Sequence, residues 1–150
     1  MVIRLMKNLF YVDTCIYLNL WQKEGDAKFG VPYWKLAEDF FEEFDNEETT
    51  FYYSGFVLKE LSFRLTKEDF EKKKSLFESS PNFKKIRISP EEFNKARKIE
   101  RELNYEFGFF DIIHMLLAMK TESILVTRDK GLLELAKKYK IISKKPEEIL

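Results

Sequence analysis

The segment Leu9-Phe10-Tyr11-Val12-Asp13 joins four consecutive apolar residues to one acid, and this pattern indicates how the fold begins. A short apolar run that ends in a polar residue is typical of a buried strand in a parallel sheet. The segment Ile124-Leu125-Val126-Thr127 has the same character and is followed, after one residue, by Asp129. We therefore expect buried strands over 8–12 and 123–127, each with an acid just beyond its carboxyl end.

Strands and helices alternate along the rest of the chain. Further strands are predicted over 49–53 and 84–88, with a short last strand at 141–142. The clearest helix start is Ser89-Pro90-Glu91-Glu92, which combines an N-cap serine, a proline and acids in the first turn. This alternation predicts an α/β domain with a central parallel sheet of four or five strands. Helices are expected over about 15–21, 33–44, 55–65, 67–77, 90–103, 109–120 and 130–138, before a terminal turn at 146–150.

Length and composition set limits on the function. The chain of 150 residues fits one domain over 1–150, and 45% of it is hydrophobic, enough for a substantial core. Lys plus Arg and Asp plus Glu each number 26, so net charge provides no general attraction to nucleic acid or membrane. The apolar runs are too short to span a membrane, and the first residues lack a signal peptide. Cys15 is the single cysteine, which excludes an internal disulfide and a Cys-rich zinc site. We expect a cytoplasmic protein.

Two more acids interrupt apolar sequence. Asp111 lies within Phe109-Phe110-Asp111-Ile112-Ile113, and Glu60 lies within Val57-Leu58-Lys59-Glu60-Leu61. Burial of a carboxylate is costly unless it is paired, hydrogen bonded or bound to a metal. In open α/β sheets, ligands bind beyond the carboxyl ends of the strands, where the strand order reverses. If the strands before Asp13 and Asp129 are neighbours, the four acids meet there, and a cation site is predicted.

Each acid also has an ordinary structural interpretation. Asp13 and Asp129 can be helix N-caps, and Asp111 in a first helical turn is favoured by the helix dipole. Glu60 can pair with Arg64 one turn further on. For one acid alone these interpretations are at least as favourable as a ligand role. The placement of all four acids at one sheet edge favours the cation site.

Two further residues near these acids require an interpretation. His114 is the only histidine and stands one turn after Asp111, a spacing that allows chelation of a metal. On an otherwise apolar helix, however, we expect a packed and hydrogen-bonded histidine. Cys15 follows Asp13 by two residues and has no histidine near it in the sequence, so we expect it to be a packing residue and not a nucleophile.

The segments around the four acids, taken in order, resemble the PIN domain family, in particular the small stand-alone VapC-type toxins. The resemblance covers nearly the whole chain and includes its ending, Lys145-Pro146-Glu147-Glu148-Ile149-Leu150. The matching segments are Phe10-Tyr11-Val12-Asp13-Thr14, Ser54-Gly55-Phe56-Val57-Leu58-Lys59-Glu60-Leu61, Phe110-Asp111-Ile112-Ile113-His114 and Leu125-Val126-Thr127-Arg128-Asp129.

The resemblance implies a three-layer α/β/α fold and a ribonuclease. By this pattern Asp13, Glu60, Asp111 and Asp129 bind Mg²⁺ or Mn²⁺, and Thr127 supplies a hydroxyl that orients water or supports the ligands. Hard divalent cations take oxygen ligands and activate water for phosphodiester hydrolysis, so the residue types agree with this chemistry. The resemblance further implies an RNA substrate, an antitoxin protein as partner and a homodimer.

The aromatic residues Trp21, Tyr33 and Trp34 are candidates for anchors of such interfaces, because aromatic side chains are enriched at binding hot spots. The alternative is that they belong to the core. The chain also departs from the family pattern. Many members carry Asn at the position of Cys15 and a second acid at the position of Gly131.

Three other functions stay open at this point. A PIN-like domain that binds RNA without cleaving it would share the fold. A receiver domain of two-component signalling is also α/β, but it requires an acidic pair after the first strand and an Asp after the third, where this chain has Ile88-Ser89-Pro90. A haloacid-dehalogenase phosphatase requires a second Asp at the position that Cys15 occupies.

Overall fold

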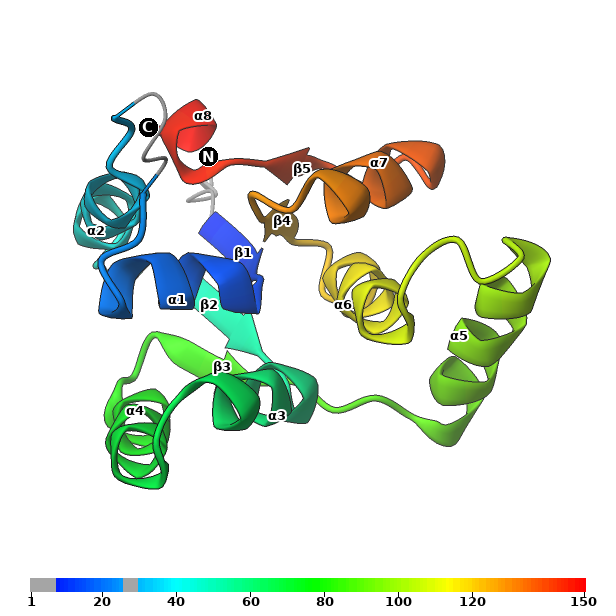
Figure 1. The fold of residues 1–150 in the computed structure, drawn as a ribbon, viewed down its shortest axis with the longest axis horizontal. Coiled ribbons are helices and arrows are strands. Elements are labelled where there is room, and N and C mark those ends of the chain that lie inside the picture. The colour runs from blue at the N-terminus through cyan, green and yellow to red at the C-terminus, as the bar shows by residue number, and fades with distance from the viewer. Residues whose placement is uncertain (1–7, 26–29) are drawn as a thin grey trace, which may run out of the picture.

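The computed structural model describes residues 8–25 and 30–150, and its centre is a five-stranded sheet (Figure 1). The strand order is β3-β2-β1-β4-β5, and every neighbouring pair is parallel. The α/β class and the parallel sheet predicted from the sequence are therefore confirmed. The strands are β1 (Asn8–Val12), β2 (Thr49–Tyr53), β3 (Phe83–Lys85), β4 (Ile124–Val126) and β5 (Ser143–Lys144).

The direction of strand order reverses at β1. The chain moves from β1 to β2 and β3 on one side, then crosses to β4 and β5 on the other side. The two strands that the apolar runs predict are thus direct neighbours, with Phe10 opposite Ile124 and Val12 opposite Val126. The crevice between their carboxyl ends is the switch point at which α/β sheets bind ligands.

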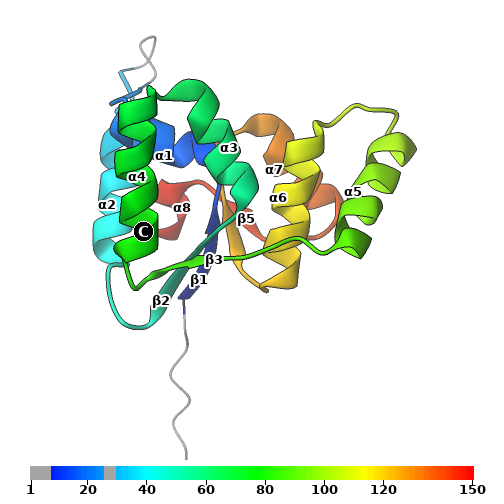
Figure 2. The same cartoon turned by 90° about the horizontal axis from the view of Figure 1, so that it is seen from below.

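Helices cover both faces of the sheet, which gives the expected three layers. In Figures 1 and 2, α1, α2 and α4 lie on one face and α5, α6 and α7 on the other, with α5 outside α6. Helix α3 lies near the carboxyl end of β2 and contacts α1, α4 and α6. The helices are α1 (Thr14–Trp21), α2 (Tyr33–Glu43), α3 (Gly55–Arg64), α4 (Lys67–Ser79), α5 (Pro90–Glu102), α6 (Phe109–Lys120), α7 (Lys130–Lys138) and α8 (Pro146–Ile149).

Alternation along β1 sends successive side chains to opposite layers. The ring of Phe10 packs against Phe40 and Phe44 of α2, with ring centroids 5.1 and 5.0 Å away. The ring of Tyr11 lies on the other face, with its centroid 5.5 Å from that of His114 in α6. One strand therefore ties together the aromatic core under α2 and the polar interior beside α6.

Side-chain caps fix several helix starts where the sequence predicts them. Ser54 begins α3 by accepting a hydrogen bond from the amide of Val57. Ser89 and Glu92 form a capping box at the start of α5, as the sequence Ser89-Pro90-Glu91-Glu92 predicts. At the start of α1, Asp13 occupies the N-cap position without a side-chain cap hydrogen bond, and Thr14 is the first helical residue.

The two edge strands differ from their predicted positions. β3 ends at Lys85 and not at 88; Ile86 and Ile88 pack against the core from the following loop. The last strand is Ser143–Lys144 and not 141–142, because the amide of Ile141 still bonds to the carbonyl of Ala136 at the end of α7. The predicted terminal turn is the short helix α8, whose start is fixed by a 2.8 Å bond from the amide of Lys145 to Glu148 Oε1.

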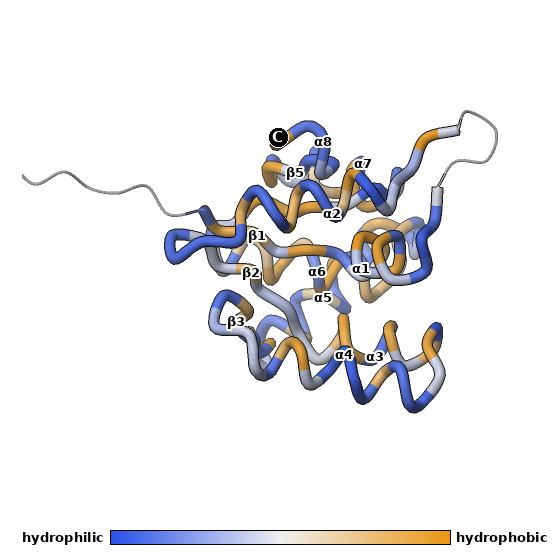
Figure 3. Tube along the Cα trace, turned by 90° about the vertical axis from the view of Figure 1, so that its left-hand side faces the viewer, coloured by the Kyte–Doolittle hydropathy of each residue, from blue (hydrophilic) through white to orange (hydrophobic). Residues whose placement is uncertain are grey.

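Hydrophobic segments gather on the strands and on the inner sides of the helices, while the outer turns are hydrophilic (Figure 3). Tyr11, Val12, Leu125 and Val126 are all 0% exposed, which places the paired strands β1 and β4 at the centre of the core. Within the described part of the chain, no helix combines the length and the apolar character that crossing a bilayer requires.

Candidate metal centre

The four predicted acids line one pocket of about 310 Å³ at the carboxyl edge of the sheet. Asp13 follows β1 and Asp129 follows β4, so the two strand ends at the switch point supply two of them. Glu60 comes from α3 and Asp111 from the first turn of α6. The structure thus brings together four carboxylates from four separate segments, as the sequence predicts; their role as metal ligands stays a prediction.

Asp13 is directed into this pocket by its neighbours. It is 5% exposed and makes no side-chain cap on α1, so the interpretation of Asp13 as a capping side chain is wrong. Its Oδ2 instead accepts hydrogen bonds from Thr127 Oγ1 at 2.8 Å and from Cys15 Sγ at 3.1 Å. Burial raises the pKa of the Asp13 carboxyl, although the nearby His114 and the two hydrogen bonds oppose that rise.

Thr127 joins the two strand ends at the switch point. Its hydroxyl donates to Asp13 Oδ2 and accepts from the backbone amide of Asp129 at 3.0 Å. The residue is 0% exposed, so this hydroxyl supports the acids from below and does not face the pocket. Loss of the hydroxyl would leave both Asp13 and the Asp129 amide without this partner.

Glu60 is held by two donors and does not pair with Arg64. Its Oε1 accepts from Thr14 Oγ1 at 3.1 Å and contacts His114 Nε2 at 2.5 Å. Arg64 Nη2 lies instead 3.8 Å from Glu24 Oε2. The expected helix-surface pair between Glu60 and Arg64 is therefore absent from the described residues, and Glu60 faces the interior of the site.

His114 is the packed, hydrogen-bonded histidine that the sequence predicts. It is 0% exposed, and its Nδ1 lies 2.7 Å from the hydroxyl of Tyr11, which lies 2.7 Å from Ser54 Oγ. Burial alone would lower the pKa of His114, but the hydrogen bond to Glu60 and the charges of Asp13, Glu60 and Asp111 outweigh it and raise that pKa. With a proton on Nε2, His114 donates to Glu60 and fixes the orientation of that carboxylate.

Asp111 has a strongly raised pKa. Burial, followed by the charges of Asp13 and Asp129, raises its pKa from 3.8 to about 7. A carboxyl with this pKa is partly protonated at neutral pH when no cation is present. The pocket therefore disfavours a negative charge on Asp111.

Asp129 combines its structural interpretation with a place at the pocket. Its Oδ1 caps α7 by accepting from the amides of Gly131 at 2.8 Å and Leu132 at 3.2 Å. It is exposed, whereas Asp13 is buried, so Asp129 stands at the mouth of the pocket. The capping interpretation of Asp129 is confirmed, and the cap holds the carboxylate beside the other acids.

Cys15 packs against the hydrophobic core, as expected, and it also lines the same pocket. Its thiol donates to Asp13 Oδ2 and lies 3.6 Å from Thr127 Oγ1. Burial, together with the charge of Asp13, raises the pKa of the Cys15 thiol well above its ordinary value, so the thiol keeps its proton. The expectation that Cys15 is not a nucleophile is consistent with this environment.

The donor set fits a hard divalent cation. Carboxylate oxygens are the ligands that Mg²⁺ and Mn²⁺ prefer, and a cation would offset both the burial and the repulsion that raise the pKa of Asp111. Asp13, Glu60 and His114 each offer one ligand atom within 4.8 Å of the others. Because His114 Nε2 already contacts Glu60, the residues that would hold a cation are the four carboxylates, with His114 as their support.

The sequence analysis did not identify several residues of the site. Tyr11 and Ser54 complete the buried chain of hydrogen bonds behind His114, and Phe63 and Arg64 line the outer wall of the pocket. A signal existed for Tyr11, because alternation along a strand that buries Phe10 toward one layer must turn Tyr11 toward the other. No comparable signal marked Phe63, which is 70% exposed.

The family model of the PIN domain matches residues 10–138, and the chain therefore belongs to the PIN domain family. The expected family resemblance is confirmed. The match begins within β1 and ends in α7, so it contains all four acids of the pocket.

Solved structures show the same fold at low sequence identity. A structure of VapBC2 from Rickettsia felis, bound to a DNA fragment from its promoter, aligns with a TM-score of 0.64 at 16% identity, over 91% of this chain and 98% of the other. FitAcB from Neisseria gonorrhoeae aligns with a TM-score of 0.62 at 14% sequence identity, over 93% of this chain and 98% of the other. A toxin–antitoxin complex from Klebsiella pneumoniae aligns with a TM-score of 0.62 at 18% sequence identity, over 93% of this chain and 98% of the other. No curated protein matches the sequence significantly.

The crowding at Asp111 predicts that the substitution Asp111→Asn stabilises the metal-free protein. A carboxyl whose pKa is raised in the folded state binds more protons when folded, so stability falls as pH rises from 3.8 to about 7. The Asp111→Asn variant has no carboxyl at this position, so its stability does not fall for this reason as pH rises. In EDTA, its melting temperature should match that of the parent near pH 4 and exceed it increasingly as pH rises through about 7.

Metal provides the control for this measurement. Mg²⁺ or Mn²⁺ should raise the melting temperature of the parent more than that of the variant, because a ligand stabilises the state that binds it. If Asp111 only complements the helix dipole, the substitution should instead destabilise the protein by about 0.3–1 kcal/mol, and metal should shift both proteins equally.

Proposed function

We propose that this protein is a metal-dependent endoribonuclease that hydrolyses RNA phosphodiester bonds. The observation that carries the proposal is the meeting of Asp13, Glu60, Asp111 and Asp129 in one pocket at the switch point of the sheet. Membership of the PIN family supports it, since PIN domains are generally nucleases. The proposal places the activity in the cytoplasm, where RNA is the available substrate.

The chemistry divides between the cation and the chain. A bound Mg²⁺ or Mn²⁺ would supply charge for the phosphate and lower the pKa of a water molecule. Asp13, buried and held by Thr127, and the half-buried Asp111 provide the inner carboxylates that would hold the cation with Glu60 and Asp129. His114 fixes Glu60 through a 2.5 Å contact, so that this carboxylate keeps one orientation while the substrate binds.

We further propose that the protein acts as the toxin of a toxin–antitoxin pair, with an antitoxin protein as partner. The support is the likeness in fold to a toxin–antitoxin complex from Klebsiella pneumoniae and to VapBC2 from Rickettsia felis. An antitoxin that covers the mouth of the acidic pocket would keep RNA away from Asp13 and Asp111. We expect it to bind near this pocket.

The nuclease proposal predicts cleavage of single-stranded RNA with Mg²⁺ or Mn²⁺ and no cleavage in EDTA. Asp13→Asn and Asp111→Asn should each lower the rate by about a hundredfold or more, because a metal site supplies several kcal/mol of transition-state stabilisation. The measurement is the cleavage rate of a labelled RNA, with the 5′ end of the product analysed for a phosphate.

Asp39→Asn is the matched control for these variants. Asp39 belongs to a second group of acids on α2, with Glu38 and Glu42, where Lys35 lies 3.0 Å from it. This variant should cleave at the parent rate. RNA binding without cleavage in the presence of either metal would contradict the nuclease proposal and favour the non-catalytic RNA-binding alternative. Full cleavage in EDTA would contradict the metal dependence.

We also propose a homodimer. The three aromatic residues considered as anchors are half-buried, and each carries a cation over its ring: Lys73 over Trp21, Arg128 over Tyr33 and Lys23 over Trp34. Sedimentation equilibrium of the purified chain should give twice the monomer mass, and Tyr33→Ala or Trp34→Ala should shift the equilibrium toward the monomer. A parent protein that stays monomeric at every concentration would contradict the dimer.

A further inference from the structure

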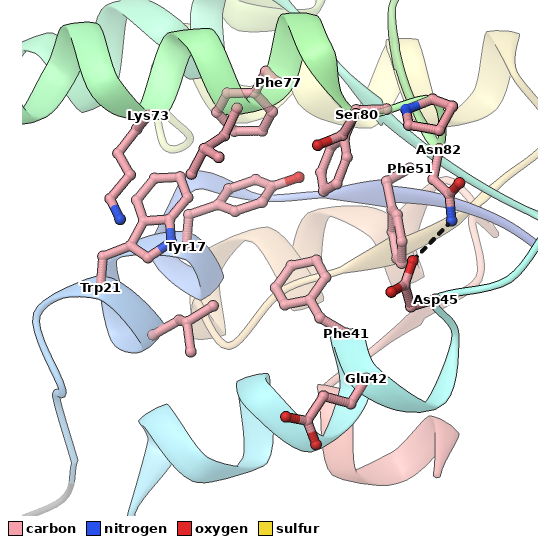
Figure 4. Close-up of a pocket in the computed structure, with 14 residues that line it drawn as sticks. Tyr17, Trp21, Phe41, Glu42, Asp45, Phe51, Lys73, Phe77, Ser80 and Asn82 are labelled. Carbon is pink, nitrogen blue, oxygen red and sulfur yellow. Dashed lines mark hydrogen bonds between the residues drawn. The ribbon is translucent and has the colours of Figure 1, made fainter.

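A second pocket, of about 400 Å³, lies between α1, α2 and α4 and is walled mainly by aromatic rings (Figure 4). The acids Glu42 and Asp45 also stand in its wall, and Asp45 accepts a hydrogen bond of 3.4 Å from Asn82. Lys73, the one cation among the described residues of this wall, lies over the Trp21 ring, 4.9 Å from its centroid. The two acids repel the phosphates of RNA, so we expect further contacts with the substrate at the metal centre itself.

Two side chains of α3 stand at the outer wall of the metal centre. Phe63 and Arg64 follow Glu60 by three and four residues, and residues with these spacings share one face of a helix. Because Glu60 faces the interior of the site, this face of α3 is turned toward the metal centre, and both side chains line the pocket of the four acids. We call Phe63 and Arg64 the rim of the metal centre.

Arg64 provides a positive charge where a substrate needs one. Among the described residues that line this pocket, four are acids and Arg64 is the one cation. A divalent cation offsets only two of four ionised carboxylates, so an RNA phosphate still meets a negative pocket. The Arg64 side chain is 57% exposed, and its contact of 3.8 Å with Glu24 joins two solvent-accessible groups, which makes it a weak interaction. The guanidinium is therefore available to a phosphate.

Phe63 provides an aromatic face beside this cation. Among the large hydrophobic side chains in the described part of the chain, it has the largest exposed fraction, 70%, and it lies outside the hydrophobic core. A single exposed ring is common on a protein surface. Here, however, the ring adjoins both Arg64 and the four acids. Proteins that bind single-stranded nucleic acid combine cations that contact the backbone with aromatic rings on which the bases stack.

We propose that the rim of the metal centre binds single-stranded RNA next to the bond that is cleaved. Arg64 pairs with the phosphate adjacent to the scissile one, and Phe63 stacks on the neighbouring base. The inference rests on the nuclease function proposed above and adds to it two positioning residues and a preference for unpaired substrate. A base within a duplex is already stacked on its neighbours, so it has no free face for Phe63.

The contact of Arg64 predicts a salt-dependent loss of RNA binding. The full chain is titrated in Ca²⁺ with a short, unstructured oligoribonucleotide of mixed sequence, and the RNA is checked for cleavage after each titration. Arg64→Gln should weaken the Kd by about tenfold and reduce the slope of log Kd against log salt by about 0.7, the value for one phosphate contact on a single strand. Arg64→Lys should keep the slope, because it retains the charge, and recover part of the affinity, because it lacks the planar fork that matches a phosphate.

The contact of Phe63 predicts a loss that depends on the bases. The parent should bind the RNA more tightly than an abasic oligomer of equal length, because an abasic strand offers no ring for stacking. Phe63→Ala should reduce this preference by about tenfold while binding the abasic oligomer as the parent does, and Phe63→Trp should keep the preference. Both Kd values come from the fluorescence anisotropy of end-labelled oligomers.

Arg87→Gln and Ile142→Ala are the matched controls at the opposite edge of the sheet. Arg87 is exposed, and its carbonyl accepts a hydrogen bond from Lys120 at the end of α6, whereas Asp111 lies in the first turn of that helix. Ile142 is an exposed apolar side chain that precedes the amino end of β5. Both variants should leave the Kd, its salt slope and the preference for bases unchanged.

Three results would overturn the inference: equal Kd values for Arg64→Gln and Arg87→Gln, a preference for bases that survives in Phe63→Ala, or no binding of RNA by the parent. If the substitutions at the rim weaken the binding of a co-purified partner protein but not the binding of RNA, the inference is also overturned and the rim is assigned to that protein.

A cleavage assay of the same variants separates this inference from the nuclease proposal. Cleavage with Mg²⁺ that is indifferent to Arg64→Gln and Phe63→Ala would remove the role of the rim and leave the nuclease intact. Binding that depends on the rim in a protein that cleaves no RNA would remove the nuclease and retain the RNA-binding rim. The expected result is a raised KM with little change in kcat for both variants, because the contacts are made in the bound ground state and in the transition state alike.

Discussion

Repulsion between carboxylates is the constraint on which the rest of this structure depends. Two unit charges about 5 Å apart at an effective dielectric of about 20 repel by about 3 kcal/mol, and here four acids share one pocket. Burial, followed by the charges of Asp13 and Asp129, raises the pKa of Asp111 to about 7, so repulsion adds to the cost of burying this carboxylate. A fold that gathers these acids must hold their carboxylates in place through hydrogen bonds from buried neighbours. It is also expected to be stabilised by a cation bound in the pocket.

The support behind the acids is built into the sheet and its neighbouring helices. Thr127 joins Asp13 to the amide of Asp129, so the ends of β1 and β4 are held together by the groups that present the acids. On the opposite side, Ser54, Tyr11 and His114 form a buried chain that ends on Glu60. The hydrogen bond to Glu60 and the charges of Asp13, Glu60 and Asp111 raise the pKa of His114 against the effect of its burial, which favours a proton close to the acids.

The sequence predicted those features that depend on local pattern. The apolar runs before Asp13 and Asp129 identified β1 and β4, and the alternation of strands and helices predicted the parallel sheet. Both predictions were possible because strand burial and helix periodicity depend on residues that are close together in the sequence. The edge strands were misplaced, since β3 and β5 have one neighbour each and their ends depend on the loops that follow. The buried chain of hydrogen bonds from Ser54 through Tyr11 and His114 to Glu60 joins residues far apart in the sequence, and no local pattern could predict which of their atoms are in contact.

The central claim is that the acidic pocket is a cation site, and the most direct measurement is the anomalous scattering of crystals soaked in Mn²⁺. The account predicts an anomalous peak within bonding distance of Asp13 and Asp111, with the contact between His114 and Glu60 retained. Soaked crystals with no peak in this pocket, and with the four carboxylates in the same positions as in metal-free crystals, would contradict it.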